Sequence, residues 1–157
     1  PEKIFVSARS RPAWLPAEVE LVLDDVGARG PLAGVAAVLK RIETTHLLVL
    51  AVDLPQMTPG HLRQLWSSAS PGVGIVPRHH GLLEPLCAIY PAEAAMAAGK
   101  ALAGPDVSLH GLVGVLVEKK QVRFYQVKKP DLPFYKNVNT PRQIANSDSS
   151  LRQAPLG

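Results

Sequence analysis

The chain has 157 residues, of which 46% are hydrophobic and 19% charged, and its net charge is +4. This composition predicts one globular domain and excludes a disordered chain, and no apolar run approaches the roughly 18 residues of a membrane span. The modest positive charge suits anionic ligands but is too small and too scattered to indicate nucleic-acid binding. One cysteine, Cys87, excludes an internal disulfide framework, and without an export leader it predicts a cytoplasmic protein.

Short strands alternate with helices through the first half of the chain. The strands are expected at residues 3–8, 19–25 and 46–53, and the helices at residues 30–43 and 58–69. Pro31 suits the first turn of the earlier helix, and Thr58 is a natural N-cap for the later one. Residues 46–53, "HLLVLAVD", are apolar without alternation, which is typical of a central parallel strand covered on both faces.

The second half continues with strands whose connections look mixed. The strands are expected at residues 73–77, 82–90 and 121–127, and the helices at residues 91–104, 107–119 and 139–147. Pro85 indicates that the strand around it is an edge or bulged strand. The whole pattern predicts an α/β fold with a mostly parallel sheet, as one domain over residues 1–146 with a flexible tail at 147–157.

Two acids, Asp24 and Asp53, end predicted strands, and in an open parallel sheet ligands bind beyond those strand ends. A carboxylate held there on rigid backbone can bind Mg²⁺, with phosphate oxygens completing the octahedron. The alternative for Asp53 is that it caps the turn before Pro55 and faces water. The pattern alone leaves both interpretations open.

Between these acids lies "RGPLAG", residues 29–34, where glycines flank a predicted helix start. Such a helix N-terminus offers free N–H groups and a dipole that favours phosphate. The segment is neither a dinucleotide fingerprint nor a P-loop. Gly34 inside the helix costs about 1 kcal/mol against alanine, so a close packing or ligand approach would explain it.

Three further features are candidates for binding. In "NVNTP", residues 137–141, an extended backbone aims Asn137 and Asn139 the same way, although a helix cap alone would explain Asn139. Glu84 is a polar residue in an apolar segment, which indicates a pocket wall. The adjacent His79 and His80 lie in a predicted turn, and no further ligand stands at zinc spacing.

Taken together and in this order, Asp24, "GPLAG", "LLVLAVDLP", "EPLCAIY" and "NVNTP" resemble molybdenum cofactor guanylyltransferase. The similarity extends from "KIFVSAR" to "NTPRQIA". It implies a three-layer Rossmann-like nucleotidyltransferase fold. It also implies a Mg²⁺-dependent enzyme that transfers GMP from GTP to molybdopterin and releases pyrophosphate.

The resemblance also implies roles for individual residues. Asp53 would be the catalytic residue and the Mg²⁺ ligand near the α-phosphate. The nucleotide would be bound by Asp24, Gly30, Pro31, Leu32 and Gly34. Molybdopterin would lie on the side of Asn137, Asn139 and Glu84. The implied partners are the two small-molecule substrates and molybdenum-insertion or molybdoenzyme chaperone proteins, without nucleic acid or membrane.

One departure from the family pattern affects these expectations. The family opens with a strand and a glycine-rich basic loop of the form LAGGxSxRMGxDK, which grips the triphosphate, and "KIFVSARSR" matches its next strand. We therefore expect the first strand, loop and helix to be missing, through a fragment, a truncated gene product or a relative that no longer catalyses. The alternatives are a non-catalytic molybdopterin- or partner-binding relative, and a cytidylyl or sugar-phosphate nucleotidyltransferase.

Overall fold

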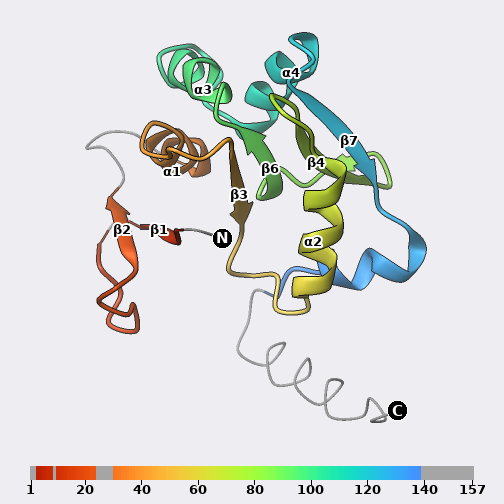
Figure 1. Ribbon diagram of the computed structural model, residues 1–157, viewed down its shortest axis with the longest axis horizontal. Coiled ribbons are helices and arrows are strands. Elements are labelled where there is room, and N and C mark those ends of the chain that lie inside the picture. The colour runs from red at the N-terminus through yellow and green to blue at the C-terminus, as the bar shows by residue number, and fades with distance from the viewer. Residues whose placement is uncertain (1–2, 9, 24–29, 139–157) are drawn as a thin grey trace.

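The structure, a computed structural model, describes residues 3–8, 10–23 and 30–138. Within these ranges strands and helices alternate along the chain (Figure 1). The strands are β1 Phe5–Ala8, β2 Glu20–Leu23, β3 His46–Leu50, β4 Gly74–His79, β5 Leu82–Leu83, β6 Cys87–Pro91 and β7 Val122–Gln126. The helices are α1 Pro31–Leu39, α2 Pro59–Ser68, α3 Ala94–Leu102, α4 Leu109–Glu118 and the 3-10 helix η1 Lys129–Tyr135.

The predicted α/β class is confirmed, but the sheet is mixed rather than mostly parallel. Its five strands follow the order β3-β6-β4-β5, with β7 pairing β4, while β1 and β2 form a separate parallel pair. Strands β3, β4 and β7 run one way, and β5 and β6 run against them. The chain returns from β4 through a tight hairpin instead of a crossover helix, and a hairpin enforces antiparallel pairing.

The single strand predicted over residues 82–90 is two strands separated by residues 84–86. Pro85 lies in the interruption and cannot donate a ladder hydrogen bond, so the expected edge or bulged strand is instead a break between the edge strand β5 and the central strand β6. The N–H of Glu84 instead donates to the carbonyl of Pro77 at 2.9 Å, and that of Cys87 to the carbonyl of Glu84 at 3.0 Å. Strand β6 then runs through the middle of the sheet, between β3 and β4.

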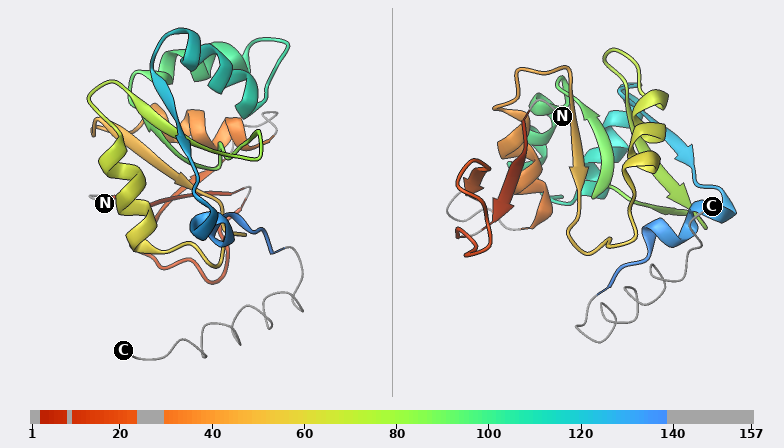
Figure 2. Two further views of the ribbon diagram at one scale, coloured as in Figure 1. Left: turned by 90° about the vertical axis from the view of Figure 1, so that its right-hand side faces the viewer. Right: turned by 60° about the horizontal axis from the view of Figure 1, so that its bottom comes forward.

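Two hydrophobic cores cover the two faces of this sheet and make three layers (Figures 1 and 2). On one face α1, α3 and α4 pack against Val76, Ala88 and Tyr90. On the other face α2 and η1 pack against Ile75, Cys87 and Ile89 through residues that include Leu65 and Tyr135. Alternate residues of β6 thus enter opposite cores, as the two-residue period of a strand requires.

Strand β3 differs from the prediction of a strand covered on both faces. Among the described residues its one partner strand is β6, so it lies at an edge of the five-stranded sheet. Leu47 and Val49 pack against the α1–α3–α4 core, but Leu48 and Leu50 on the opposite face are 36% and 43% exposed. The strand ends at Leu50, and Val52 beyond it is 94% exposed. Apolar sequence alone therefore overestimated both the length and the burial of this strand.

The helix starts agree with the sequence signals. The hydroxyl of Thr58 accepts from the N–H of His61 at 3.2 Å, which confirms the predicted N-cap of α2. Gly30 precedes Pro31 with a φ of 87°, a left-handed conformation that favours glycine.

Helix α1 ends at Leu39, four residues before the predicted end. The predicted helix at 139–147 and the tail at 147–157 lie outside the described residues. No helix in the described part of the chain is long and apolar enough to cross a membrane.

The close approach of β4 to β6 makes Gly74 a test of this topology. A Cβ at Gly74 would collide with the carbonyl oxygen of Ile89 and would lie 2.9 Å from Pro91 Cδ. We expect Gly74→Ala to lower the free energy of unfolding by at least about 2 kcal/mol, measured by urea denaturation.

The matched control is Gly114→Ala, in the middle of α4, where an added Cβ meets nothing within 4 Å. Because alanine has a higher helix propensity than glycine, the free energy of unfolding of this variant should rise by about 0.5 to 1 kcal/mol. Equal effects of the two substitutions would contradict the close β4–β6 contact.

Candidate active site

The loop between β3 and α2, residues 51–58, carries Asp53 and is fixed by backbone hydrogen bonds on both sides. The N–H of Ala51 donates to the carbonyl of Leu86 at 2.7 Å. The carbonyl of Asp53 accepts from the N–H of Val138 at 2.9 Å. Asp53 therefore lies three residues beyond the end of β3, held between the β5–β6 interruption and the segment that follows η1.

The carboxylate of Asp53 is half-buried and forms no hydrogen bond or ion pair with any residue that the structure describes. Within the described ranges, no three His, Cys, Asp or Glu side chains converge on one point as a metal site. A Mg²⁺ ion bound with substrate phosphates needs only one or two carboxylates. An unpaired carboxylate on a fixed loop fits that requirement. Asp24, the second predicted acid, lies outside the described residues.

A pocket of about 400 Å³ opens at the N-terminus of α1. Of the four residues around this helix start that were expected to bind the nucleotide, Gly30 and Pro31 line the pocket, whereas Leu32 and Gly34 are buried within the helix. The remaining lining residues, which the sequence analysis missed, are Pro85, Leu86, Val107, Ser108, Leu109 and His110. Ser108 is the N-cap of α4, accepting from the N–H of Gly111 at 3.0 Å, and a serine before a helical run is the signal that could have found it.

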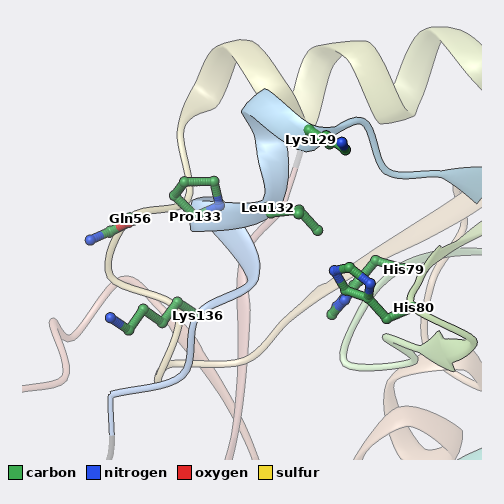
Figure 3. A pocket seen from close by; sticks show the side chains of 7 residues that line it. All are labelled: Gln56, His79, His80, Lys129, Leu132, Pro133 and Lys136. Atoms are coloured by element: carbon green, nitrogen blue, oxygen red, sulfur yellow. The ribbon is translucent and has the colours of Figure 1, made fainter.

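A second, larger pocket of about 630 Å³ lies between the β4–β5 turn and η1 (Figure 3). Its lining residues are Gln56, His79, His80, Lys129, Leu132, Pro133 and Lys136. Glu84, expected in a pocket wall, stands behind this lining, where its carboxylate accepts from Nε2 of His79 at 2.8 Å. Asn137 is exposed directly after Lys136, and Asn139 lies outside the described residues.

The β3–α2 loop connects the two pockets. Ala51 is hydrogen-bonded to Leu86, which lines the pocket at α1, and Gln56 lines the pocket at η1. Asp53 lies between these two positions in the chain. The loop thus borders the η1 pocket through Gln56 and reaches a lining residue of the α1 pocket through Ala51, with the free carboxylate of Asp53 between these two contacts.

A buried polar cluster holds η1 against the sheet. Nε2 of His61, a residue only 3% exposed, is 2.8 Å from the hydroxyl of Tyr135. Burial lowers the pKa of His61, and burial also raises the pKa of Tyr135. Burial, with the charge of Glu84 beside it, raises the pKa of the Cys87 thiol to about 12. Cys87 is fully buried in the α2-side core, and its thiol stays protonated at neutral pH.

Comparison with known proteins assigns this chain to a family. Residues 1–120 match the model of the MobA-like NTP transferase domain. The chain belongs to the MobA-like NTP transferase family. This assignment agrees with the family resemblance noted in the sequence and with the three-layer α/β fold.

Individual members of the MobA-like family show how far the similarity extends. The chain is 32% identical over 143 residues to a probable molybdenum cofactor guanylyltransferase of Opitutus terrae, covering 89% of this chain and 71% of that protein. A protein of the same description from Natronomonas pharaonis is 31% identical, with 82% and 64% covered. The chain thus spans about two thirds of the length of these relatives.

A solved structure agrees with the fold. It is the molybdopterin-guanine dinucleotide biosynthesis protein A of Archaeoglobus fulgidus, 25% identical to this chain, with a TM-score of 0.64 over 87% of this chain and 70% of that one. The similarity confirms the predicted Rossmann-like nucleotidyltransferase fold.

The hydrogen bond between His61 and Tyr135 should contribute to stability. Tyr135→Phe removes the hydroxyl and leaves His61 buried without that partner, so we expect a loss of about 1 to 2 kcal/mol in the free energy of unfolding. The matched control is Tyr125→Phe, because the buried hydroxyl of Tyr125 has no hydrogen-bond partner among the described residues. That variant should remain within about 0.5 kcal/mol of the parent. A larger loss for Tyr125→Phe than for Tyr135→Phe would contradict the assignment.

The lowered pKa of His61 predicts a dependence of stability on pH. In the unfolded chain His61 takes up a proton near its ordinary pKa of 6.5, whereas in the folded chain burial lowers this pKa. The contribution of neutral, buried His61 to the free energy of unfolding is fully present above the unfolded pKa. It is lost as the pH falls through the lower folded pKa. Urea midpoints measured from pH 7.5 to 5 should fall more for the parent than for His61→Gln. Parallel curves would overturn the prediction.

Proposed function

We propose that this protein is a nucleotidyltransferase of molybdenum cofactor biosynthesis, which transfers GMP from GTP to molybdopterin and releases pyrophosphate. The similarity to proteins described as molybdenum cofactor guanylyltransferases, over 82% to 89% of the chain, carries this proposal. The position of Asp53 on a loop that touches two pockets supports it. The proposed setting is the cytoplasm, with molybdenum-insertion or molybdoenzyme chaperone proteins as partners.

The proposed reaction exchanges one phosphoanhydride for another. An oxygen of the molybdopterin phosphate attacks the α-phosphorus of GTP, and the bond from that phosphorus to the bridging oxygen of the β-phosphate breaks. Pyrophosphate leaves with the bonding electrons, and the product contains a new anhydride between GMP and the acceptor. Such transfers depend mainly on positioning and on neutralising charge, with little covalent help from the protein.

In this proposal the residues of the loop and the two pockets share the positioning. The Gly30–Pro31 pocket at the N-terminus of α1 takes the nucleotide, because helix N–H groups and a close backbone suit phosphate. Leu32 and Gly34 contribute through the helix backbone that they help to form. Asn137 lies on the acceptor side, beside the pocket at η1.

Asp53 is the residue that would hold Mg²⁺. The ion, when bound, neutralises charge on the phosphate oxygens in the transition state. Asp53 is suited to the role because its carboxylate is half-buried, has no competing partner among the described residues, and is anchored through its own carbonyl to Val138. That anchor limits movement of the carboxylate when a ligand arrives.

The test of the proposed function is release of pyrophosphate from GTP in the presence of molybdopterin and Mg²⁺. The chain should be assayed as it stands and also preceded by the opening strand and glycine-rich loop of the family. Release that requires both substrates, in either form, supports the proposal. If neither form releases pyrophosphate while an active family member does so under the same conditions, the proposal is wrong. CTP in place of GTP tests the choice of base.

In whichever form is active, Asp53→Ala should lower the rate of pyrophosphate release by at least about 100-fold, because charge neutralisation at the α-phosphate is lost. The urea midpoint should stay near that of the parent, since the Asp53 side chain makes no contact that folding requires. Glu43→Ala, which removes an exposed carboxylate before β3, is the matched control and should keep full activity. An Asp53→Ala protein with most of its activity would remove the metal role.

A further inference from the structure

The pocket between the β4–β5 turn and η1 gathers basic side chains from separate parts of the chain. Lys129 is the first residue of η1 and Lys136 follows its end, while His79 and His80 come from the β4–β5 hairpin about fifty residues earlier. None of the seven lining residues is acidic. Figure 3 shows the two histidines on one side of the pocket, with Gln56 and Lys136 on the other and Leu132 between them. Such a lining favours an anion.

The histidine side of the pocket is held by the hairpin. His79 pairs with Leu82, so His80 and Gly81 form a two-residue connection, with φ angles of 49° and 81°. Positive φ at both central residues is what the tight hairpin turn matching strand twist requires. The turn therefore fixes the backbone of His80 at the edge of the pocket.

His79 is oriented from behind. Its Nε2 donates to Glu84, and its ring packs on Tyr135 with 5.6 Å between ring centroids. Its other nitrogen, Nδ1, is buried without a hydrogen-bond partner among the described residues. The Glu84 carboxylate is thus engaged by His79, and does not itself line the pocket.

The part of the lining that η1 contributes between these two sides is largely apolar, and its backbone is restricted. Leu132 and Pro133 of η1 face the pocket, and prolines at 130 and 133 restrict the backbone of this short helix. Tyr135 anchors the end of η1 to His61. An apolar wall beside a basic lining suits a ligand that carries both a flat ring system and an anionic group.

The pocket is close in the chain and in space to the candidate catalytic loop. Gln56 belongs to the same loop as Asp53, and the N–H of Val138, two residues after Lys136, donates to the Asp53 carbonyl. The same loop also contacts Leu86, a lining residue of the Gly30–Pro31 pocket, through the N–H of Ala51. The two pockets can therefore hold two different ligands of one reaction.

We propose that this pocket binds the phosphate monoester of the acceptor, with Lys129, Lys136 and His80 facing the phosphate and Leu132 and Pro133 facing the ring system. His79 and Glu84 are positioning residues for the histidine side. The proposal rests on the proposed function for the identity of the acceptor. Binding of a phosphate monoester that carries a flat ring system to this basic pocket can be tested without any turnover.

The binding test uses 1-naphthyl phosphate and 1-naphthol, a pair that differs only in the phosphate. The ring C–H signals of the five histidines in the 157-residue chain are followed by NMR during each titration. We expect saturable shifts at His79 and His80 with naphthyl phosphate, none at His46, which lines neither pocket, and at least tenfold weaker binding of naphthol. Absence of shifts at His79 and His80, an equal shift at His46, or equal affinity for both probes would overturn the proposal.

Lysine variants locate the phosphate within the pocket. Lys129→Gln and Lys136→Gln should each weaken naphthyl phosphate binding about threefold to tenfold, as expected for partly exposed charge-assisted contacts. Lys100→Gln, an exposed lysine in the last turn of α3, is the matched control and should leave affinity unchanged. Because all three side chains are exposed, their circular dichroism should match the parent. Unchanged affinity in both pocket variants would contradict the proposal.

The outcome for this pocket is separable from that for the proposed function. Where pyrophosphate is released, Lys136→Gln should raise the KM for molybdopterin and leave the KM for GTP unchanged. If pyrophosphate is released but neither KM changes in the lysine variants, the function stands and the pocket assignment fails. If no form of the protein releases pyrophosphate, the naphthyl phosphate titration alone decides the pocket.

Discussion

Strand β6 is the constraint on which the rest of the structure depends. All five of its residues, Cys87–Pro91, are buried, and the side chains from Cys87 to Tyr90 enter the two cores alternately. It pairs antiparallel with β3 on one side and with β4 on the other. The hydrogen bond from Ala51 to Leu86, just before β6, extends this pairing past the end of β3. The loop that carries Asp53 therefore takes its position from β6.

The same loop explains how two distant motifs meet. "GPLAG" and "NVNTP" are more than a hundred residues apart, yet the loop contacts Leu86 beside the first motif and Val138 within the second. The buried pair of His61 and Tyr135 keeps η1 on α2, so the second contact is fixed from the far side as well. A nucleotidyltransferase needs its two substrates aligned, and in the proposed function these backbone contacts would hold the loop between them.

Family membership and site chemistry rest on different observations. The match over residues 1–120 and the similarity to guanylyltransferases identify the family, whereas the free carboxylate and the two pockets come from the geometry of this chain. The basic pocket at η1 had no sequence signal that a single motif could provide. His79 and His80 lie in a predicted turn without a further ligand at zinc spacing, and the other lining residues come from separate segments of the chain.

The sequence by itself determined the α/β class, the N-cap at Thr58, the interruption at Pro85 and the acid that follows the apolar run of β3. These features depend on residues close together in the chain, so their spacing and side-chain chemistry can be inferred from the sequence. Tertiary structure alone decided that β6 runs antiparallel, that β3 is an edge strand among the described residues, and that Leu32 and Gly34 turn inward. It also decided that Glu84 supports His79, because pairing and burial join residues whose separation in sequence carries no signal.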